Sequence, residues 1–291
     1  MSDRPIALEW LNPHFAVGIA DSRLLECIQS SHQLVEVLDT PAFGKLFRLD
    51  GRCMTSEKDE FFYHETLVHP AATAHSDPRR ALVIGGGDGG SAEELLKYAA
   101  MEHVAVAELD RTVVDVAKRH LQAVHRGAFD DARLALHIGD GLQYAEQAAA
   151  RGERFDLIVL DLTDPDSPAQ ALYSPAFFAL ARRLLNPGGT LTLHLGSPIH
   201  QAAQVGMLMD RLRTAFAVVR PMTLCIPLYG SLWAMAVASD ALDPARMEPA
   251  AVARRLGQRR IGNLQYYGAP MHAALFALPP FLQSLLAGKP A

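Results

Sequence analysis

A glycine-rich turn that also contains an acid is the segment of this chain with the clearest chemical meaning. Gly85, Gly87 and Gly90 fit the pattern G-x-G-x-x-G after an apolar strand-like run, a pattern that commonly holds the pyrophosphate of a dinucleotide. Asp88 lies inside the same turn, and its carboxylate would repel those phosphates. The turn therefore favours a ligand without phosphate and with positive charge, such as an S-adenosyl compound, over NAD.

Acids also follow the ends of the next three predicted strands. Glu108 ends the second strand, Asp140 follows the third and Asp161 ends the fourth. A single acid at such a place is usually a helix N-cap. Four acids in succession, counting Asp88, indicate a binding site, because ligands of parallel sheets bind at the carboxyl ends of the strands. We expect Glu108 to bind ribose hydroxyls and Asp140, in Gly139-Asp-Gly141, to accept from an adenine amino group.

The segment Asp161-Leu-Thr-Asp-Pro165 contains a candidate proton acceptor. Asp161 and Asp164 are three residues apart around a predicted turn, and paired carboxylates can hold a cationic amine and take a proton from it. A protonated alkylamine has no free lone pair, so an enzyme that alkylates one must first remove a proton. The alternative is that Asp161 is an N-cap and Asp164-Pro165 an ordinary turn.

The elements that would position these residues alternate between strands and helices from Arg80 onward, which is typical of βαβ units in a parallel sheet. The predicted strands are 81–85, 103–108, 134–138, 157–161 and 190–195, with a closing hairpin of 218–226 and 232–238. Asn186-Pro-Gly-Gly189 predicts a turn before the fifth strand. Asp50-Gly51 predicts a hairpin in a small antiparallel N-terminal domain. We expect an α/β fold with a Rossmann-like, methyltransferase-type, mostly parallel sheet, divided into domains 1–75 and 76–291.

The composition limits the class of protein. The 291 residues are 49% hydrophobic and 20% charged, as in an ordinary globular protein. A net charge of −5 argues against a general nucleic-acid-binding surface. The three cysteines follow no metal-ligand spacing, so neither a metal site nor a disulfide framework is expected. The sequence lacks a signal-peptide-like start and an apolar run of membrane-spanning length, which predicts a cytoplasmic protein with no membrane partner.

The motifs together resemble those of the polyamine aminopropyltransferase family, of the spermidine synthase type. Phe43–Gly51 resembles its N-terminal hairpin, and Asp59-Glu-Phe-Phe-Tyr-His-Glu65 its DEF-x-YHE segment. The glycine turn and the segment 161–165 resemble its two most specific motifs. Tyr266-Tyr267 with His272-Ala-Ala-Leu-Phe-Ala-Leu-Pro279 resembles its C-terminal pattern, so the resemblance covers nearly the whole chain.

The resemblance implies transfer of an aminopropyl group from decarboxylated S-adenosylmethionine, as co-substrate, to an amine, commonly putrescine. The products would be spermidine and methylthioadenosine, made in the cytoplasm by a homodimer or homotetramer with no permanently bound cofactor. By position, Asp161 matches the proton acceptor, while Asp164, Tyr63 and Tyr229 match residues that orient the acceptor amine. Asp88 and His64 match positions near the aminopropyl or polyamine chain. The positions around the nucleoside are matched by Gln33, Gly85, Glu108, Asp140, Gly141 and Pro168.

Three departures from the family pattern leave the acceptor amine open. Met54 stands where the family usually has glutamine, His194 stands where a polar residue, usually glutamine, follows the fifth strand, and Ser167 replaces a glycine. A competing interpretation is an S-adenosylmethionine methyltransferase, although Asp88 and Asp161 would repel the carboxylate of that ligand. Two more interpretations remain open: a catalytically inactive polyamine-binding protein and, disfavoured by Asp88, an NAD-dependent oxidoreductase.

Overall fold

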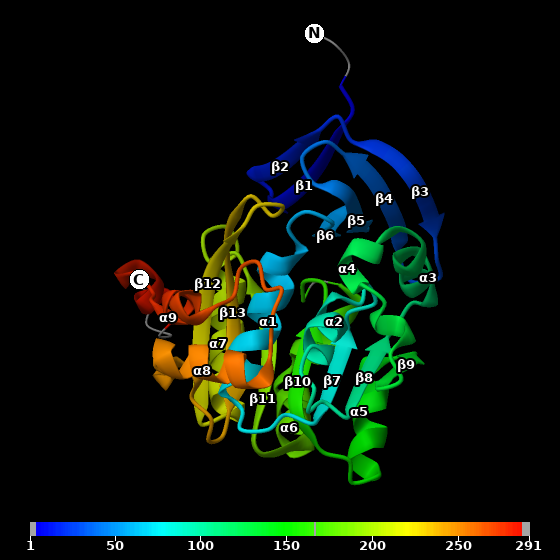
Figure 1. Ribbon diagram of the computed structural model, residues 1–291. Helices are drawn as coiled ribbons and strands as arrows, with labels where there is room; N and C mark the ends of the chain where they lie inside the picture. Colours follow the sequence, from blue (N-terminus) through cyan, green and yellow to red (C-terminus); the bar gives the residue numbers. More distant parts are fainter. Residues whose placement is uncertain (1–3, 166, 287–291) are drawn as a thin grey trace.

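A seven-stranded sheet forms the centre of the molecule in the computed structural model, which describes residues 4–165 and 167–286 (Figure 1). The strand order is β12-β13-β11-β10-β7-β8-β9. The five strands from β11 to β9 are parallel, and β13 pairs antiparallel with both β11 and β12. The prediction of a Rossmann-like, mostly parallel sheet is confirmed. The strands are β7 (Arg80–Gly85), β8 (His103–Glu108), β9 (Leu134–Ile138), β10 (Phe155–Asp161), β11 (Leu185–Gly196), β12 (Val218–Ile226) and β13 (Ser231–Ser239).

Helices cover both faces of this sheet, which explains why its strands read as continuous apolar runs rather than as alternating ones. In β7, Ala81 and Val83 face one hydrophobic core, and Leu82 and Ile84 face the other. The first core includes α1 (Glu60–Ala74), α2 (Gly90–Leu96), α8 (Pro249–Arg259) and α9 (Ala269–Phe276). The second includes α5 (Gly141–Ala150), α6 (Pro175–Leu184), α7 (Ala202–Ala215) and α10 (Pro280–Leu286).

The N-terminal strands are antiparallel and lie beyond one end of the central sheet (Figure 1, blue). They are β1 (Ile6–Asn12) and β2 (Phe15–Ala20), which form one hairpin, and the sheet β3 (Arg23–Gln29), β4 (Leu34–Thr40), β5 (Gly44–Leu49) and β6 (Arg52–Ser56). The predicted hairpin at Asp50-Gly51 joins β5 to β6, and both turn residues have positive φ, as a tight hairpin requires.

Contacts made by helices α3 and α1 show how the N-terminal strands and the central sheet pack together. Helix α3 (Arg111–His120) packs on the N-terminal sheet, where Val113 shares a core with Val35 and Phe47. Helix α1 packs against α2 and β11, although it precedes residue 75. The division of the chain at residue 75 stays a prediction.

One local expectation was wrong. Asn186-Pro-Gly-Gly189 was expected as a turn before the fifth strand, but β11 already begins at Leu185. Leu185 pairs with Phe155, and the next registered pair is Thr190 with Leu157, so residues 186–189 form an irregularity within the strand. Gly188, at φ 80°, provides the left-handed backbone there. No helix in the described part of the chain has both the length and the apolarity that crossing a membrane requires.

Candidate active site

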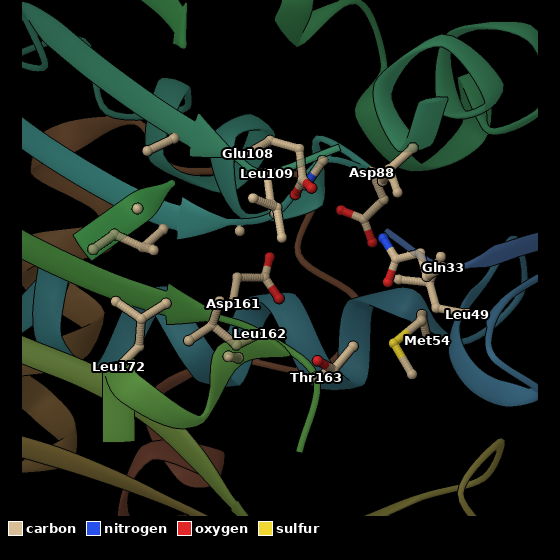
Figure 2. Close-up of a pocket in the computed structure, with 18 of the residues that line it drawn as sticks. Gln33, Leu49, Met54, Asp88, Glu108, Leu109, Asp161, Leu162, Thr163 and Leu172 are labelled. Atoms are coloured by element: carbon tan, nitrogen blue, oxygen red, sulfur yellow. The ribbon is translucent and has the colours of Figure 1, made fainter. Parts of the chain in front are cut away.

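A pocket lies at the carboxyl ends of β7, β8 and β10, where the strand order of the parallel sheet reverses direction (Figure 2). In Figure 2 the side chains of Asp88, Glu108 and Asp161 surround this space. Most residues expected at the site from the sequence line it together: Gln33, Tyr63, His64, Gly85, Asp88, Glu108, Asp140, Gly141, Asp161 and Tyr229. Pro168 begins a 3-10 helix (Pro168–Tyr173), and its side chain, like residue 166, lies outside the described part of the structure.

The glycine turn after β7 packs directly against the backbone at the end of β10. Gly85 has a φ of 79°, and a Cβ atom there would overlap the carbonyl oxygen of Asp161. The next amide, that of Gly86, donates to the same carbonyl oxygen at 2.9 Å. A Cβ at Gly90 would overlap the His64 ring. The glycines therefore permit a close approach that sets Asp161 and His64 on either side of the turn.

The end of the pocket expected to hold the nucleoside contains Glu108. Its two carboxylate oxygens accept from the backbone amides of Gly87 (3.2 Å) and Asp110 (2.9 Å). Burial raises the pKa of Glu108 to about 7, and these amide bonds only partly oppose the shift. Gln33 reaches the same region from the N-terminal sheet, and its Nε2 donates to Asp110 at 3.4 Å.

Asp140 lines the pocket and is also the N-cap of a helix. Its Oδ1 accepts from the amide of Gln143 at 2.9 Å and so caps α5. Asp88 likewise accepts from the amide of Gly90 at 2.9 Å. Asp161 differs from both, since its Oδ2 is buried without a hydrogen-bond partner among the described residues.

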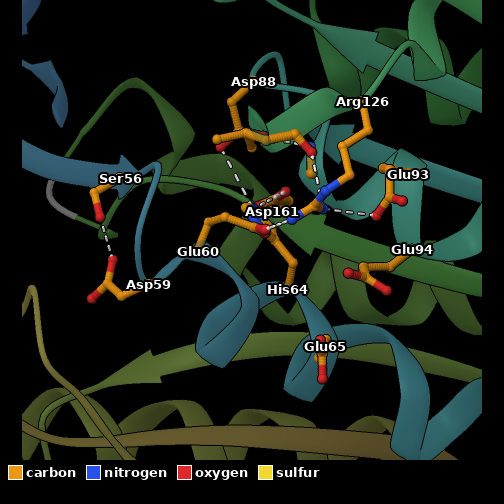
Figure 3. A network of polar contacts seen from close by, with 12 residues as sticks. Ser56, Asp59, Glu60, His64, Glu65, Asp88, Glu93, Glu94, Arg126 and Asp161 are labelled. Atoms are coloured by element: carbon orange, nitrogen blue, oxygen red, sulfur yellow. Dashed lines mark hydrogen bonds and ion pairs between the residues drawn. The ribbon is translucent and has the colours of Figure 1, made fainter. Parts of the chain in front are cut away.

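A buried histidine lies between the acids of the pocket (Figure 3). The Nε2 atom of His64 is 3.5 Å from Asp88 Oδ2 and 3.9 Å from Asp161 Oδ2. Its Nδ1 is 2.8 Å from Glu60 Oε2, and the other Glu60 oxygen accepts from Arg126 at 2.6 Å. Arg126 thereby orients Glu60, and Glu60 orients the His64 ring toward the two aspartates.

This arrangement moves the pKa values of the three groups in different directions. Burial lowers the pKa of His64, but Asp88, Glu60 and Asp161 outweigh that effect and raise it well above the usual range. Burial raises the pKa of Asp88, but the adjacent His64 outweighs it and the net shift is downward. Burial and then the charge of Asp88 raise the pKa of Asp161. Of the two aspartates, Asp161 is therefore the better proton acceptor.

The ligand atoms of His64, Asp88 and Asp161 all lie within 4.8 Å of one another, a spacing that a small cation could use. A cation here could equally be the ammonium group of an organic ligand, since carboxylates bind both. The expectation that the protein uses no metal remains a prediction.

A second pocket adjoins the first and shares Met54, Tyr63, Leu162, Thr163 and Tyr229 with it. The Tyr229 hydroxyl donates to the carbonyl oxygen of Met54 at 2.7 Å. Burial, followed by nearby acids, raises the pKa values of Tyr63 and Tyr229 well above their usual range. Both hydroxyls therefore stay protonated at neutral pH, and because the Tyr229 proton is donated to Met54, the Tyr229 oxygen can accept a hydrogen bond from an amine N–H.

Asp164 lines this second pocket, whereas Asp161 lines the first. The Oδ2 atom of Asp164 lies 3.1 Å from Arg52 NH1 and accepts from Gln201 Nε2 at 3.2 Å. The sequence pattern led us to expect both carboxylates in one pocket. The structure places them in two adjoining pockets that share a wall and gives them different charge partners, so their joint action on an amine stays a prediction.

Further residues support the site from outside it, some of them in motifs that the sequence analysis named and some not. Asp59 accepts from the Leu228 amide at 2.8 Å and from the Ser56 hydroxyl at 2.5 Å, and so holds the loop that carries Tyr229. His194 contacts the Leu162 carbonyl oxygen through Nε2 at 2.8 Å and so holds the segment after Asp161. The DEF-x-YHE motif was a signal for Asp59 and Glu60, whereas no motif marks Arg52 or Arg126.

The fold and the pocket together define a Rossmann-like α/β enzyme with carboxylates at the ends of its parallel strands. Residues 60–245 match the family described as the spermine/spermidine synthase domain. A polyamine aminopropyltransferase from Nitrosomonas europaea is 49% identical over 280 residues, which cover 96% of this chain and 85% of that protein. Polyamine aminopropyltransferase 2 from Hyperthermus butylicus is 35% identical over 273 residues, 93% of this chain and 88% of that protein.

Solved structures show the same likeness. A spermidine synthase in complex with the transition state analogue AdoDATO has a TM-score of 0.89 at 29% identity, covering 97% of this chain and 95% of that one. Spermidine synthase from Thermotoga maritima has a TM-score of 0.88 at 29% identity, covering 98% and 95%. The chain belongs to the spermine/spermidine synthase family and is an enzyme of the polyamine aminopropyltransferase type.

Proposed function

We propose that this enzyme transfers the aminopropyl group of decarboxylated S-adenosylmethionine to a diamine, with putrescine as the expected acceptor. The observation that carries the proposal is the position of Asp161. It is a carboxylate with a raised pKa and a buried oxygen that accepts no hydrogen bond from the described residues, next to the two tyrosines that line both pockets. A general base for an amine acceptor needs such a position between donor and acceptor.

In the reaction the acceptor nitrogen attacks the aminopropyl carbon bonded to the sulfonium sulfur. The new C–N bond forms as the C–S bond breaks, and the electron pair of that bond stays on sulfur in methylthioadenosine. The attacking nitrogen loses its proton to Asp161, while the Tyr63 and Tyr229 hydroxyls orient the amine from the shared wall of the two pockets. Glu108, Asp140 and Gln33 would hold the nucleoside at the other end.

The acids of the pocket favour the decarboxylated donor over intact S-adenosylmethionine. Asp88 and Asp161 can bind the ammonium group of the aminopropyl chain, whereas the methionine carboxylate of the intact compound would face the same two acids. The solved relative in complex with AdoDATO supports this choice of ligand class. The same acids argue against a methyltransferase.

The proposal is tested by incubating the protein with decarboxylated S-adenosylmethionine and each of a panel of amines, then identifying products by mass. We expect methylthioadenosine together with spermidine from putrescine, and no loss of turnover in EDTA. Intact S-adenosylmethionine should bind at least roughly tenfold more weakly by calorimetry, equivalent to about 1.4 kcal/mol. Methyl transfer from the intact compound, or equal binding of both, would overturn the proposal.

Family resemblance also supports a cytoplasmic enzyme that forms a homodimer or homotetramer and acts on small-molecule amines. A net charge of −5 agrees with cationic substrates and with the absence of a nucleic-acid partner.

A further inference from the structure

A partly exposed arginine reaches the buried side of the active site through one carboxylate. The Arg126 side chain is 36% exposed, and its NH2 donates to Glu60 Oε1 at 2.6 Å. The Glu60 side chain is 1% exposed, and its other oxygen lies 2.8 Å from His64 Nδ1. The opposite ring nitrogen of His64 faces Asp88 and Asp161, at 3.5 Å and 3.9 Å. One line of contacts therefore runs from Arg126 to the candidate proton acceptor (Figure 3).

The backbone at Arg126 has a conformation that glycine adopts more readily than arginine. Arg126 is the C-cap of α4 (Gln122–His125), with φ 41° and ψ 34°, in the left-handed region. Helices commonly end on glycine in this conformation, because a Cβ atom is strained there. Such strain at a residue other than glycine is often found where the side chain has a function. At Arg126 the side chain contacts Glu60, so the strained backbone and the contact point to the same role.

Of the two acids that Arg126 contacts, Glu60 depends on it more. Arg126 also donates to Glu93 at 3.2 Å, but Glu93 has a second cation, the Lys97 ammonium group, at 3.2 Å. Among the described residues, Arg126 supplies the arginine or lysine contact of Glu60. Without Arg126, one oxygen of a buried carboxylate would lose its charge partner, which is strongly unfavourable. Glu60 would then turn toward water and no longer hold the His64 ring.

We propose that Arg126 is a positioning residue for aminopropyl transfer, which acts through Glu60 on the His64 ring. A fixed ring keeps the spacing between Asp88 and Asp161, and with it the direction from which Asp161 can take a proton. Displacement of a reacting group by about 1 Å can cost roughly 100-fold in rate. This inference rests on the proposed aminopropyl transfer and concerns the geometry of its base.

The test measures kcat with decarboxylated S-adenosylmethionine and putrescine in Arg126→Gly, Arg126→Lys, Glu60→Gln and the double variant of Arg126→Gly with Glu60→Gln. Glycine suits the left-handed backbone, so Arg126→Gly removes the side chain without adding backbone strain. We expect kcat to fall roughly tenfold in Arg126→Gly. Arg126→Lys keeps the charge and should restore at least part of the loss. The double variant should be no slower than Glu60→Gln alone, because Arg126 acts through Glu60.

Methylthioadenosine affinity and a matched variant separate positioning from a general loosening of the site. Affinity by calorimetry should stay native in Arg126→Gly, because this ligand lacks the aminopropyl chain. The matched control is Arg260→Gly. Arg260 is the exposed C-cap of α8, has the same left-handed backbone (φ 55°) and lines the same surface pocket as Arg126. This variant should keep both native kcat and native affinity.

The possible outcomes separate this inference from the proposed function. If the native protein transfers an aminopropyl group to no amine, the proposed function itself fails. If the native protein is active and Arg126→Gly keeps its kcat, or Arg126→Lys is as slow as Arg126→Gly, the inference is overturned. Loss of methylthioadenosine affinity together with kcat, or losses that add in the double variant, would also overturn it. Circular dichroism checks the fold of each variant, and Arg126→Gln takes the place of Arg126→Gly if the glycine variant is unfolded.

Discussion

The two aspartates of one short motif have different surroundings, which supports a different proposed role for each. Asp161 lies beside Asp88 and His64, and its buried Oδ2 accepts no hydrogen bond from the residues that the structure describes. Asp164 is held by Arg52 and Gln201 in the adjoining pocket. A buried carboxylate near another acid takes up protons readily, whereas a carboxylate that accepts from an arginine and an amide is fixed in position. These surroundings support the proposed roles, proton transfer for Asp161 and amine orientation for Asp164.

Replacement of Asp161 by asparagine should remove the proton acceptor while preserving the size of the side chain. We expect turnover with the decarboxylated donor and putrescine to fall roughly 10²–10⁴-fold. Methylthioadenosine affinity, measured by calorimetry, should change little because Glu108, Asp140 and Gln33 remain. Higher pH should partly restore the rate, since more of the amine is then already deprotonated.

The control for that variant is Asp115→Asn, which removes an exposed acid from α3. It should leave both turnover and affinity at the native level. Near-native turnover of Asp161→Asn at neutral pH would exclude Asp161 as the general base and reduce the motif to a turn.

The raised pKa of Glu108 predicts a pH-dependent nucleoside affinity. Ribose hydroxyls donate to an ionised carboxylate, but burial keeps Glu108 largely protonated below its pKa of about 7. Binding must then release a proton, so methylthioadenosine affinity should increase as pH rises toward 7 and level off above it. Each pH unit below 7 should weaken binding by up to about tenfold.

Calorimetry of methylthioadenosine between pH 5.5 and 8 measures this dependence. The ligand carries no ammonium group, so its affinity reports on the nucleoside end of the pocket. Glu108→Gln should bind more weakly at pH 8 and show a flat profile. A flat profile in the native protein would contradict the expectation that nucleoside binding ionises Glu108.

At the scale of elements, the sequence predicted the strands well because burial on both faces leaves a continuous apolar signature. The strand ends that carry Glu108 and Asp161 were placed correctly. The segment 186–189 was assigned wrongly, because proline and glycine serve a turn and an irregular strand equally well. The pair between Arg126 and Glu60 could not be predicted, since nothing in sequence spacing brings α1 and the end of α4 (Gln122–His125) together.

Glu65 fastens the C-terminal segment to helix α1. Its buried carboxylate accepts from the backbone amides of Gln265 (2.7 Å), Tyr266 (2.9 Å) and Tyr267 (2.7 Å). Glu65→Gln would place an amide donor against at least one of these amide donors. We expect a loss of about 2 kcal/mol in the free energy of unfolding, or roughly 5 °C in Tm.

Thermal unfolding followed by circular dichroism measures that loss. The matched control is Glu102→Gln, whose native side chain is exposed and forms a surface pair with Arg79, so its Tm should move little. Equal shifts in the two variants would mean that the three amide bonds to Glu65 add nothing beyond a surface contact.

At the scale of the whole molecule, the pocket needs both the N-terminal strands and the central sheet. Gln33, Leu49 and Met54 come from the first, while Asp88, Glu108 and Asp161 come from the second (Figure 2). One hydrophobic core also runs through both, from Ala7 and Leu46 to α1 and β12. Ligand binding should therefore stabilise the two parts together rather than the central sheet alone.

This expectation is tested by removing a side chain that lies far from the central sheet in sequence. Gln33→Ala should weaken methylthioadenosine binding roughly fivefold, as loss of one hydrogen bond worth about 1 kcal/mol would.

In the native protein, ligand at 100 times its Kd should add about 2.7 kcal/mol of stability, seen as a higher Tm in a single transition. Gln33→Ala should need proportionally more ligand for the same rise. Gln29→Ala, an exposed glutamine in the same strand region, is the control and should behave as the native protein does. Unchanged affinity in Gln33→Ala, or a Tm rise confined to one of two separate transitions, would show that the N-terminal strands do not form part of the nucleoside site.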